Sequence, residues 1–244
     1  MAIVCKNCGR VFDGNFCYSC GQPADTHQLN VHFIWHDIQH GLFHFDEGIY
    51  FSVKELYTRP GHSIREFISG KRIKHFRPIS LVIVLATVYG LLYHSFEIDV
   101  FTSGETQAVK IEADINQWIS GHYYWLTLAT IPLYTLGTYI CFKSQGYNYI
   151  EYFVLNAFKA AQRLILHLAT FPVLYYFNGT PTIKTVTTIL YILDIVLIYW
   201  TNIQFFDRLR TVKVMLLSAL SHVIFLICVC IILVLILLLF GHLN

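Results

Sequence analysis

Charged residues are scarce in this sequence: Asp, Glu, Lys and Arg make up 13% of its 244 residues, whereas hydrophobic residues make up 55%. With a mean hydropathy of +0.53, this scarcity excludes an ordinary soluble globular protein, in which about a quarter of the residues are charged. The apolar core of a signal peptide is also missing, because cysteines and charged residues stand where it would have to be. We therefore expect an integral membrane protein with a small polar segment at its N-terminus.

Enzyme signatures are missing as well. The sequence contains no G-x-S-x-G elbow, no Walker loop and no G-x-G-x-x-G fingerprint. The pairs His36-Asp37 and His44-x-Asp46 could serve acid–base chemistry on a lipid headgroup, but short pairs of this kind are common by chance. We expect a protein that is not an enzyme and keep a membrane enzyme acting on a lipid headgroup as an alternative.

Five apolar stretches are long enough to cross a bilayer, which takes about 20 residues. They do not alternate polar and apolar residues as barrel strands do, and backbone in lipid must be helical or closed into a barrel. The sequence therefore predicts an all-α polytopic membrane protein with about five transmembrane helices. The predicted spans are 79–96, 123–142, 152–177, 185–206 and 214–240.

The basic residues predict the orientation of these spans, because cytoplasmic loops carry an excess of Lys and Arg. Cations gather in 71–77, at Lys143 and in 208–213, whereas the loops 97–121 and 178–184 contain one lysine each. We expect the N-terminus in the cytoplasm and the C-terminus outside, in the cytoplasmic (inner) membrane of a bacterium.

Two Cys-x-x-Cys pairs near the N-terminus indicate a metal site. A cytoplasmic segment is kept reduced, which argues against disulfides, and no strand-to-helix turn of a thioredoxin-like domain is visible. Gly9 and Gly21 follow the two pairs and accept the tight turn of a zinc knuckle. Four thiolates would hold one structural zinc ion, with an iron–sulfur site or a redox pair as alternatives. The predicted ligands are Cys5, Cys8, Cys17 and Cys20.

The first 95 residues also carry a recognisable series of motifs. After the cysteine pairs and an aromatic, His-rich segment come Asp46-x-Gly48, Leu56-x-x-Arg59-Pro60-Gly61, Ile64, Gly70-Lys71-Arg72 and Pro78. In this series the chain resembles a bacterial family of uncharacterised membrane proteins, domain-of-unknown-function family 3667. The resemblance implies a cytoplasmic zinc ribbon on a multi-helix membrane domain and supplies no activity. We expect a ribbon over 1–25, an amphipathic and juxtamembrane helical segment over 26–78, and a transmembrane domain over 79–244.

Histidines recur every fourth residue in the second segment, so on a helix they form one stripe. Adjacent members have the spacing of helical zinc pairs, and Asp37, Asp46 or Glu47 could add an oxygen ligand. The stripe therefore predicts a second metal site. An interfacial amphipathic helix and a pH sensor are the alternatives. The four histidines are His32, His36, His40 and His44.

A basic cluster precedes the first predicted span. Ser63-x-x-Glu66 is a capping-box pattern and predicts a helix that starts at about Ile64. The cations predict contact with anionic phospholipid headgroups, either as a plain topology signal or as a phosphate pocket at Gly70. Nucleic acid is not expected as a partner. The six cations are Arg59, Arg65, Lys71, Arg72, Lys74 and Arg77.

Ionisable residues also occur inside the predicted spans, where they are costly and normally face protein or water. Lys159, Arg163 and His167 follow one another at i, i+4 and i+8. Counted from the cytoplasmic ends of their spans, Arg163 and Asp194 lie at equal depth, which predicts that they form an ion pair. Gln162, Asn202 and His222 are predicted neighbours. The pair is either a packing device or part of a functional cavity, unless 147–163 forms an interfacial helix whose cations reach the surface.

Three functions remain open from the sequence. The first is a membrane-anchored interaction or regulatory module, whose zinc ribbon docks a cytoplasmic protein and whose helices anchor it or form a homo-oligomer. The second is a small channel, transporter or lipid-handling protein that uses the region of Arg163 and Asp194. The third is the membrane enzyme considered above. Because no catalytic set is present, the first is the favoured hypothesis.

Overall fold

The computed structural model describes residues 2–24, 26, 29–31, 33–34, 48–99, 118 and 121–241. These residues form a two-stranded antiparallel sheet, seven α-helices and one short 3₁₀ helix. The strands are β1 (Ile3–Val4) and β2 (Val11–Phe12), and the 3₁₀ helix is η1 (Lys143–Gln145). The α-helices are α2 (Gly48–Thr58), α3 (Pro60–Ser69), α4 (Pro78–Ser95), α6 (Tyr123–Phe142), α7 (Tyr149–Tyr176), α8 (Thr182–Phe205) and α9 (Thr211–Gly241).

Each of the five predicted spans is a helix, α4, α6, α7, α8 or α9, with bounds within a few residues of the prediction. Four helical segments are long and apolar enough to cross a membrane: Pro78–Ser95, Trp125–Gln145, Thr182–Phe205 and Thr211–Leu235. These four helices support the predicted class of an all-α membrane protein. The helix α7 is not among them, although its 28 residues make it longer than each of these four segments.

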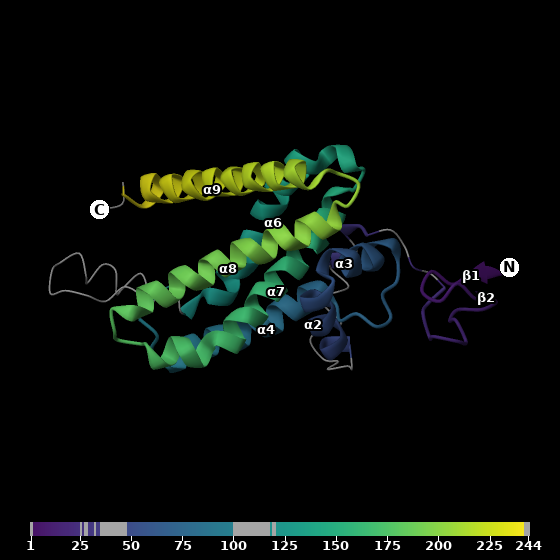
Figure 1. The fold of residues 1–244 in the computed structure, drawn as a ribbon, viewed down its shortest axis with the longest axis horizontal. Coiled ribbons are helices and arrows are strands. Elements are labelled where there is room, and N and C mark those ends of the chain that lie inside the picture. Colours follow the sequence, from purple (N-terminus) through teal and green to yellow (C-terminus); the bar gives the residue numbers. More distant parts are fainter. Residues whose placement is uncertain are drawn as a thin grey trace.

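The helix α7 lies in the middle of the bundle, where it packs against α4, α6 and α8 (Figure 1). The connections 143–148, 177–181 and 206–210 are short, so α6, α7, α8 and α9 run alternately up and down the bundle. The last helix packs chiefly against α6 and leaves much of its apolar surface exposed, including Leu216, Ile227 and Leu233. In water this would be an unusually large apolar surface, whereas in lipid it is the expected one.

The N-terminal sheet and the loops around it form a small knob, residues 2–24, at the end of the bundle where α3 lies. The far end of α9 points the opposite way (Figure 1). Between the knob and the bundle, α2 and α3 form an elbow at Arg59 that packs on α7 and α8. The guanidinium of Arg65 caps α8, because it donates to the carbonyl oxygens of Gln204 and Phe205 and pairs with Asp207 at 2.8 Å.

The start of α3 differs from the prediction. The helix begins at Pro60, four residues before the predicted start, and Arg59 is its N-cap without a side-chain hydrogen bond. Proline favours the first helical position because its φ angle is already helical and its missing N–H is not needed there. Ser63 therefore lies inside the helix, where its hydroxyl contacts His75 instead of capping a terminus. The capping-box interpretation of Ser63 and Glu66 was wrong.

The close packing of the elbow predicts that a larger residue at position 61 is destabilising, because a Cβ atom on Gly61 would lie 2.3 Å from the backbone nitrogen of Phe205. We expect Gly61→Ala to force α3 away from α8 and to lower the free energy of unfolding by about 1–3 kcal/mol, the usual cost of overpacking. The measurement is thermal unfolding in detergent. Gly121→Ala is the matched control, since a Cβ there meets nothing within 4 Å. Equal melting temperatures for the two variants would contradict the close packing of α3 on α8.

Candidate metal centre and intramembrane polar cluster

The knob is built from two copies of one backbone turn. In the first copy, the N–H of Gly9 donates to the carbonyl of Cys5 (2.9 Å), and the N–H of Cys5 donates to the carbonyl of Arg10 (2.8 Å). Gly21, Cys17 and Gln22 repeat both hydrogen bonds at 2.8 and 2.9 Å. Both glycines have a positive φ, +75° and +73°, which other residues rarely adopt. The glycines therefore have the role that the sequence predicted for them.

The two turns bring the four sulfur atoms together. All four lie within 4.8 Å of one another, and the closest pairs are Cys5–Cys20 at 3.5 Å and Cys8–Cys17 at 3.6 Å. A tetrahedron with Zn–S bonds of about 2.3 Å has sulfur–sulfur edges of about 3.8 Å, whereas a disulfide bond is about 2.0 Å long. The cysteines are free thiols, and their spacing fits a metal ion at the centre of the group.

The electrostatics of the knob favour a thiolate at one of these positions. The backbone N–H of Gln22 and the side chain of Asn7 lower the pKa of the Cys20 thiol to about 6. Because the thiolate is the metal-binding form of cysteine, this hydrogen bonding favours metal binding at Cys20. At Cys8 the backbone hydrogen bond of Arg10 lowers the pKa, but desolvation and the other three thiols outweigh it and raise the pKa to about 11. Within the described part of the chain, the remaining cysteines, Cys141, Cys228 and Cys230, lie on α6 and α9 and take no part in the cluster.

Gln22 also joins the knob to the helices. Its side chain is 1% exposed, donates to the carbonyl of Gly70 at 2.6 Å and accepts from the N–H of Arg72 at 3.3 Å. Gly70 ends α3 with a φ of +112°, and the alkyl stem of Lys6 packs against it so closely that a Cβ would lie 2.7 Å away. The fold of the second knuckle thus positions the residue that holds the knob on α3.

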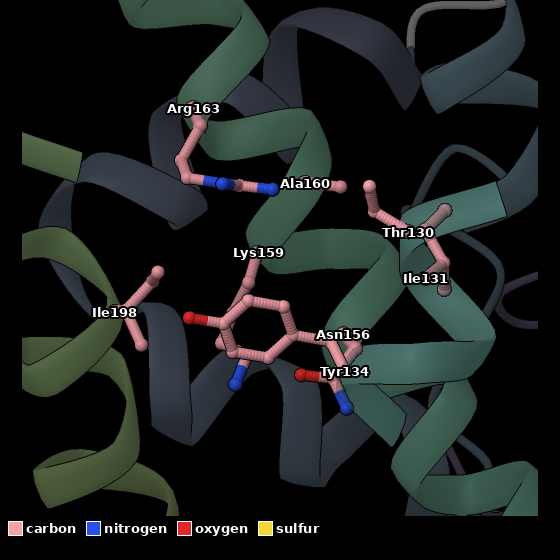
Figure 2. A pocket seen from close by; sticks show the side chains of 8 residues that line it. All are labelled: Thr130, Ile131, Tyr134, Asn156, Lys159, Ala160, Arg163 and Ile198. Atoms are coloured by element: carbon pink, nitrogen blue, oxygen red, sulfur yellow. The ribbon is translucent and has the colours of Figure 1, made fainter. Parts of the chain in front are cut away.

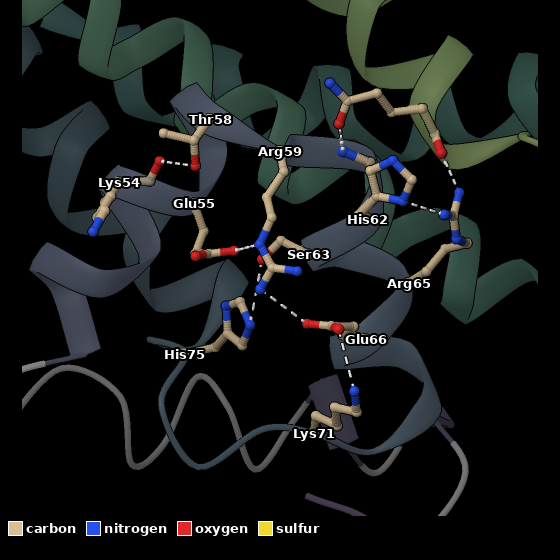
Figure 3. Close-up of polar contacts among 12 residues, drawn as sticks. Lys54, Glu55, Thr58, Arg59, His62, Ser63, Arg65, Glu66, Lys71 and His75 are labelled. Atoms are coloured by element: carbon tan, nitrogen blue, oxygen red, sulfur yellow. Dashed lines mark hydrogen bonds and ion pairs between the residues drawn. The ribbon is translucent and has the colours of Figure 1, made fainter.

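The predicted phosphate pocket at Gly70 is not what the structure shows, because Lys6 covers this glycine and its carbonyl is bonded to Gln22. Most cations of the basic cluster contact other groups of the protein, in place of a phosphate (Figure 3). Arg59 bridges Glu55 (2.6 Å) and Glu66 (3.2 Å), and Lys71 pairs with Glu66 at 3.1 Å. Arg72 lies over Phe67, Lys74 lies over Phe51, and Arg65 caps α8 as described above. Arg77 is the N-cap of α4.

The predicted histidine stripe, His32, His36, His40 and His44, lies outside the described residues. A different histidine, His75, which the sequence did not single out, is enclosed beside the elbow. Its ring meets Phe51 and Phe67 edge-on at centroid distances of 5.0 and 5.7 Å, and its Nε2 lies 3.4 Å from the hydroxyl of Ser63. Burial lowers the pKa of His75 to about 4, so the ring is neutral at physiological pH.

Inside the bundle, Asp194 pairs with His167, whose Nε2 lies 3.1 Å from Oδ2 of the carboxylate. The predicted partner, Arg163, lies one helical turn away, across from Ile198. Among the described residues, Arg163 has no ion pair. Equal depth does not select the partner of Asp194, because His167 lies one turn from Arg163 on the same face of α7 and its ring reaches the carboxylate.

The predicted neighbours take part in a network of hydrogen bonds across the bundle. Lys159 on α7 donates to Asn202 on α8 (3.2 Å), which donates to Ser218 on α9 (2.9 Å). Gln162 accepts from Thr201 (3.0 Å) and donates to the carbonyl of Leu56 in α2 (2.6 Å). The interhelical contacts of Thr201 and Ser218 were not predicted from the sequence, although hydroxyl residues within apolar helices are a known signal for such contacts.

His222 on α9 forms a second polar group with two tyrosines. One ring nitrogen meets the hydroxyl of Tyr134 on α6, and the other lies 3.1 Å from the hydroxyl of Tyr191 on α8. Nearby, the ring of Tyr134 lies 5.7 Å from the ammonium group of Lys159. The structure therefore brings His222 close to Lys159, and places His167 with Asp194 in a separate contact.

A small cavity of ≈ 10 Å³ lies between α6, α7 and α8 (Figure 2). Lys159, Ala160 and Arg163 line it on one side, and Figure 2 shows Tyr134 and Ile198 facing them. This volume is about what one water molecule needs. The remaining lining residues are Thr130, Ile131 and Asn156.

One region of the chain matches the model of a known protein family. The model of a family described as "Protein of unknown function (DUF3667)" matches residues 46–90, which include α2, α3 and much of α4. The match supports the resemblance to this family over that segment, and the four cysteines lie outside it. No curated protein matches the chain. No solved structure matches it.

The matched segment contains the residues that build the elbow. Arg59 links α2 to α3 through Glu55 and Glu66, Pro60 starts α3, and Gly61 allows the approach of α8. Gly70 then ends α3 with the positive φ that its position requires. In this chain the Arg-Pro-Gly motif is thus explained by the packing of the elbow.

The burial of His75 predicts how stability depends on pH. Its pKa in the folded protein lies below the ordinary value of 6.5, so the unfolded chain binds the proton first as the pH falls. Stability from this group is fully present above about pH 6.5, and about 2 kcal/mol of it is lost between pH 7 and pH 5. Thermal unfolding at the two pH values measures the loss.

His75→Gln removes the titrating ring and should reduce the difference between pH 7 and pH 5. His62→Gln is the control, because His62 lies on the exposed side of α3. A pH dependence that is unchanged in His75→Gln would show that the buried ring is not its source.

Proposed function

We propose that this protein is a five-helix membrane protein whose N-terminal knob binds one structural zinc ion and docks a cytoplasmic protein. The fifth crossing is α7. Its neighbours α6 and α8 are apolar enough to cross, and the connections to both are short. A helix of 28 residues is about 42 Å long, which is enough to span the hydrocarbon core.

The knob lies on the cytoplasmic side in this proposal. Lys143, Arg208 and Lys213 all lie in or beside the connections at the knob end of the bundle, as the excess of cytoplasmic cations requires. The end of α9 points to the opposite side, which places it outside the cell. A bacterial cytoplasmic membrane is the proposed location, and anionic headgroups meet the knob-side surface of the bundle.

Zinc is the metal that the four-thiolate group fits best, because a closed tetrahedral site of this kind is structural and leaves no position for a substrate. The knob has a very small core, formed by Cys5, Phe12 and Cys17. Such a core contributes little to folding, so metal binding supplies most of the free energy that orders the knob.

The observation that carries the docking function is the outer surface of the knob. Phe16 is 64% exposed and Tyr18 is 74% exposed, and the cross-strand pair Val4 and Val11 is also exposed. Exposed aromatic residues are enriched where proteins bind one another. Gln22 holds the knob on α3 through a different surface, so these side chains remain available for a partner.

The close packing inside the bundle favours the role of a membrane anchor over that of a channel or transporter. The cavity beside Arg163 is ≈ 10 Å³, which is far smaller than the pockets of about 300–1,000 Å³ that usually hold ligands. Polar side chains near it are used in contacts between helices. We therefore assign the membrane helices the role of anchoring, alone or as a homo-oligomer, and the knob the role of recognition.

The test of docking uses a photo-crosslinking amino acid at position 16 in cells. We expect a discrete crosslinked cytoplasmic protein from position 16 and none from position 50, the control, where Tyr50 is at least as exposed but lies on α2 outside the knob. The purified partner should then bind Phe16→Ser about tenfold more weakly than the wild type, as expected for an aromatic anchor. Tyr50→Ser should bind like the wild type. Equal binding by all three proteins would refute the docking surface.

Metal analysis of the purified protein tests the zinc site. We expect one zinc ion per chain, none in Cys17→Ser, and one in the control Cys230→Ser, which alters a cysteine on α9. Two ions in the wild type, with one lost in a His36 and His40 double substitution, would instead show that the histidine stripe binds metal. Retention of zinc by Cys17→Ser would exclude the four-cysteine site.

A further inference from the structure

Lys159 and Arg163 lie one helical turn apart on α7. Neither has a carboxylate partner among the residues that the structure describes. Lys159 is 3% exposed, and its ammonium group contacts the amide oxygen of Asn202 and the ring of Tyr134. The Nε of Arg163 is buried without a hydrogen-bond partner. Buried charges are normally paired, because their desolvation is otherwise not compensated.

The nearest carboxylate on α8 does not neutralise both cations. Asp194 lies one turn further along the bundle, where Oδ2 is bonded to His167 and Oδ1 has no hydrogen-bond partner. Lys159 and Arg163 therefore have no carboxylate of their own among the described residues of the bundle. Like charges at i and i+4 on a helix also repel each other. An anion beside the two side chains would reduce this repulsion.

The cavity fits such an anion by position and by size. Lys159 and Arg163 line it together, and their side chains extend from α7 toward the face of α6 and α8 (Figure 2). Its volume of ≈ 10 Å³ accepts a single particle about as large as a water molecule. A phosphate, a carboxylic acid or a lipid headgroup is larger than this space.

We propose that Lys159 and Arg163 bind one small monovalent inorganic anion of the halide class inside the helix bundle. The guanidinium Nε–H of Arg163, which has no other partner, donates to the ion, and the ion reduces the repulsion between Arg163 and the ammonium group of Lys159, which stays bonded to Asn202. The site stabilises the packing of α7 against α6 and α8. It is independent of the docking function proposed for the knob.

The experiment is thermal unfolding of the full-length protein in detergent, in gluconate buffer at constant ionic strength. Raising chloride from about 1 mM to about 100 mM should raise the melting temperature by several degrees, because the ion binds only the folded state. Bromide should act like chloride, and the larger divalent sulfate should have no effect. Lys159→Met and Arg163→Met should lose the response to chloride, whereas the control Lys213→Met, at the exposed start of α9, should keep it.

A direct measurement of chloride binding tests the proposal even where the α7 variants do not fold. Equilibrium dialysis of the wild-type protein against radioactive chloride should find one bound ion per chain. The absence of bound chloride, together with equal melting temperatures in chloride and gluconate, would overturn the proposal and leave the cavity with a water only. An unchanged chloride response in Lys159→Met would also overturn it.

Discussion

In the proposed topology, the polar face of α7 must find its partners inside the protein, because lipid offers none. This constraint explains why the helix with buried cations lies at the centre and the more apolar helices lie around it. Gln162 bonds to α2 and α8, Lys159 to α8, and His167 to Asp194. The outermost of these helices, α9, carries no Asp or Glu and exposes its apolar side chains.

The same helix connects the membrane bundle to the elbow and the knob. Gln162 and Tyr57 hold α2 on α7, Arg59 holds α3 on α2, and Arg65 holds α8 on α3. Gln22 then fixes the knob to the end of α3. The proposed zinc ion would act at the start of this chain of contacts, since the knuckle that contains Gln22 has a very small core of its own. These contacts hold the knob at a fixed position relative to the bundle, which is where the proposed docking surface would face its partner.

The sequence was sufficient for features that depend on local composition. Apolar length located α4, α6, α7, α8 and α9, and the glycines after each cysteine pair located the two knuckles. It was insufficient where two patterns competed or where distant segments set the geometry. Pro60 determined the start of α3 against the signal at Ser63, whereas Asn148 and Glu151 form a true capping box at the start of α7. Asp194 pairs with His167 although Arg163 lies at the same depth, because depth along a helix cannot choose between two side chains one turn apart on the same face of α7.

The central claim is that α7, despite its charges, crosses the membrane inside the bundle. Single cysteines at Ser144 and Thr180, both exposed and lying on either side of α7, test it most directly. A membrane-impermeant maleimide is applied to sealed cells and to inverted vesicles, with the helix cysteines replaced. The same protein without the added cysteine measures the background labelling of the four knob cysteines. The account predicts that position 144 reacts only from the cytoplasmic side and position 180 only from the outside. Labelling of both positions from the same side would contradict it, because α7 would then lie at the surface.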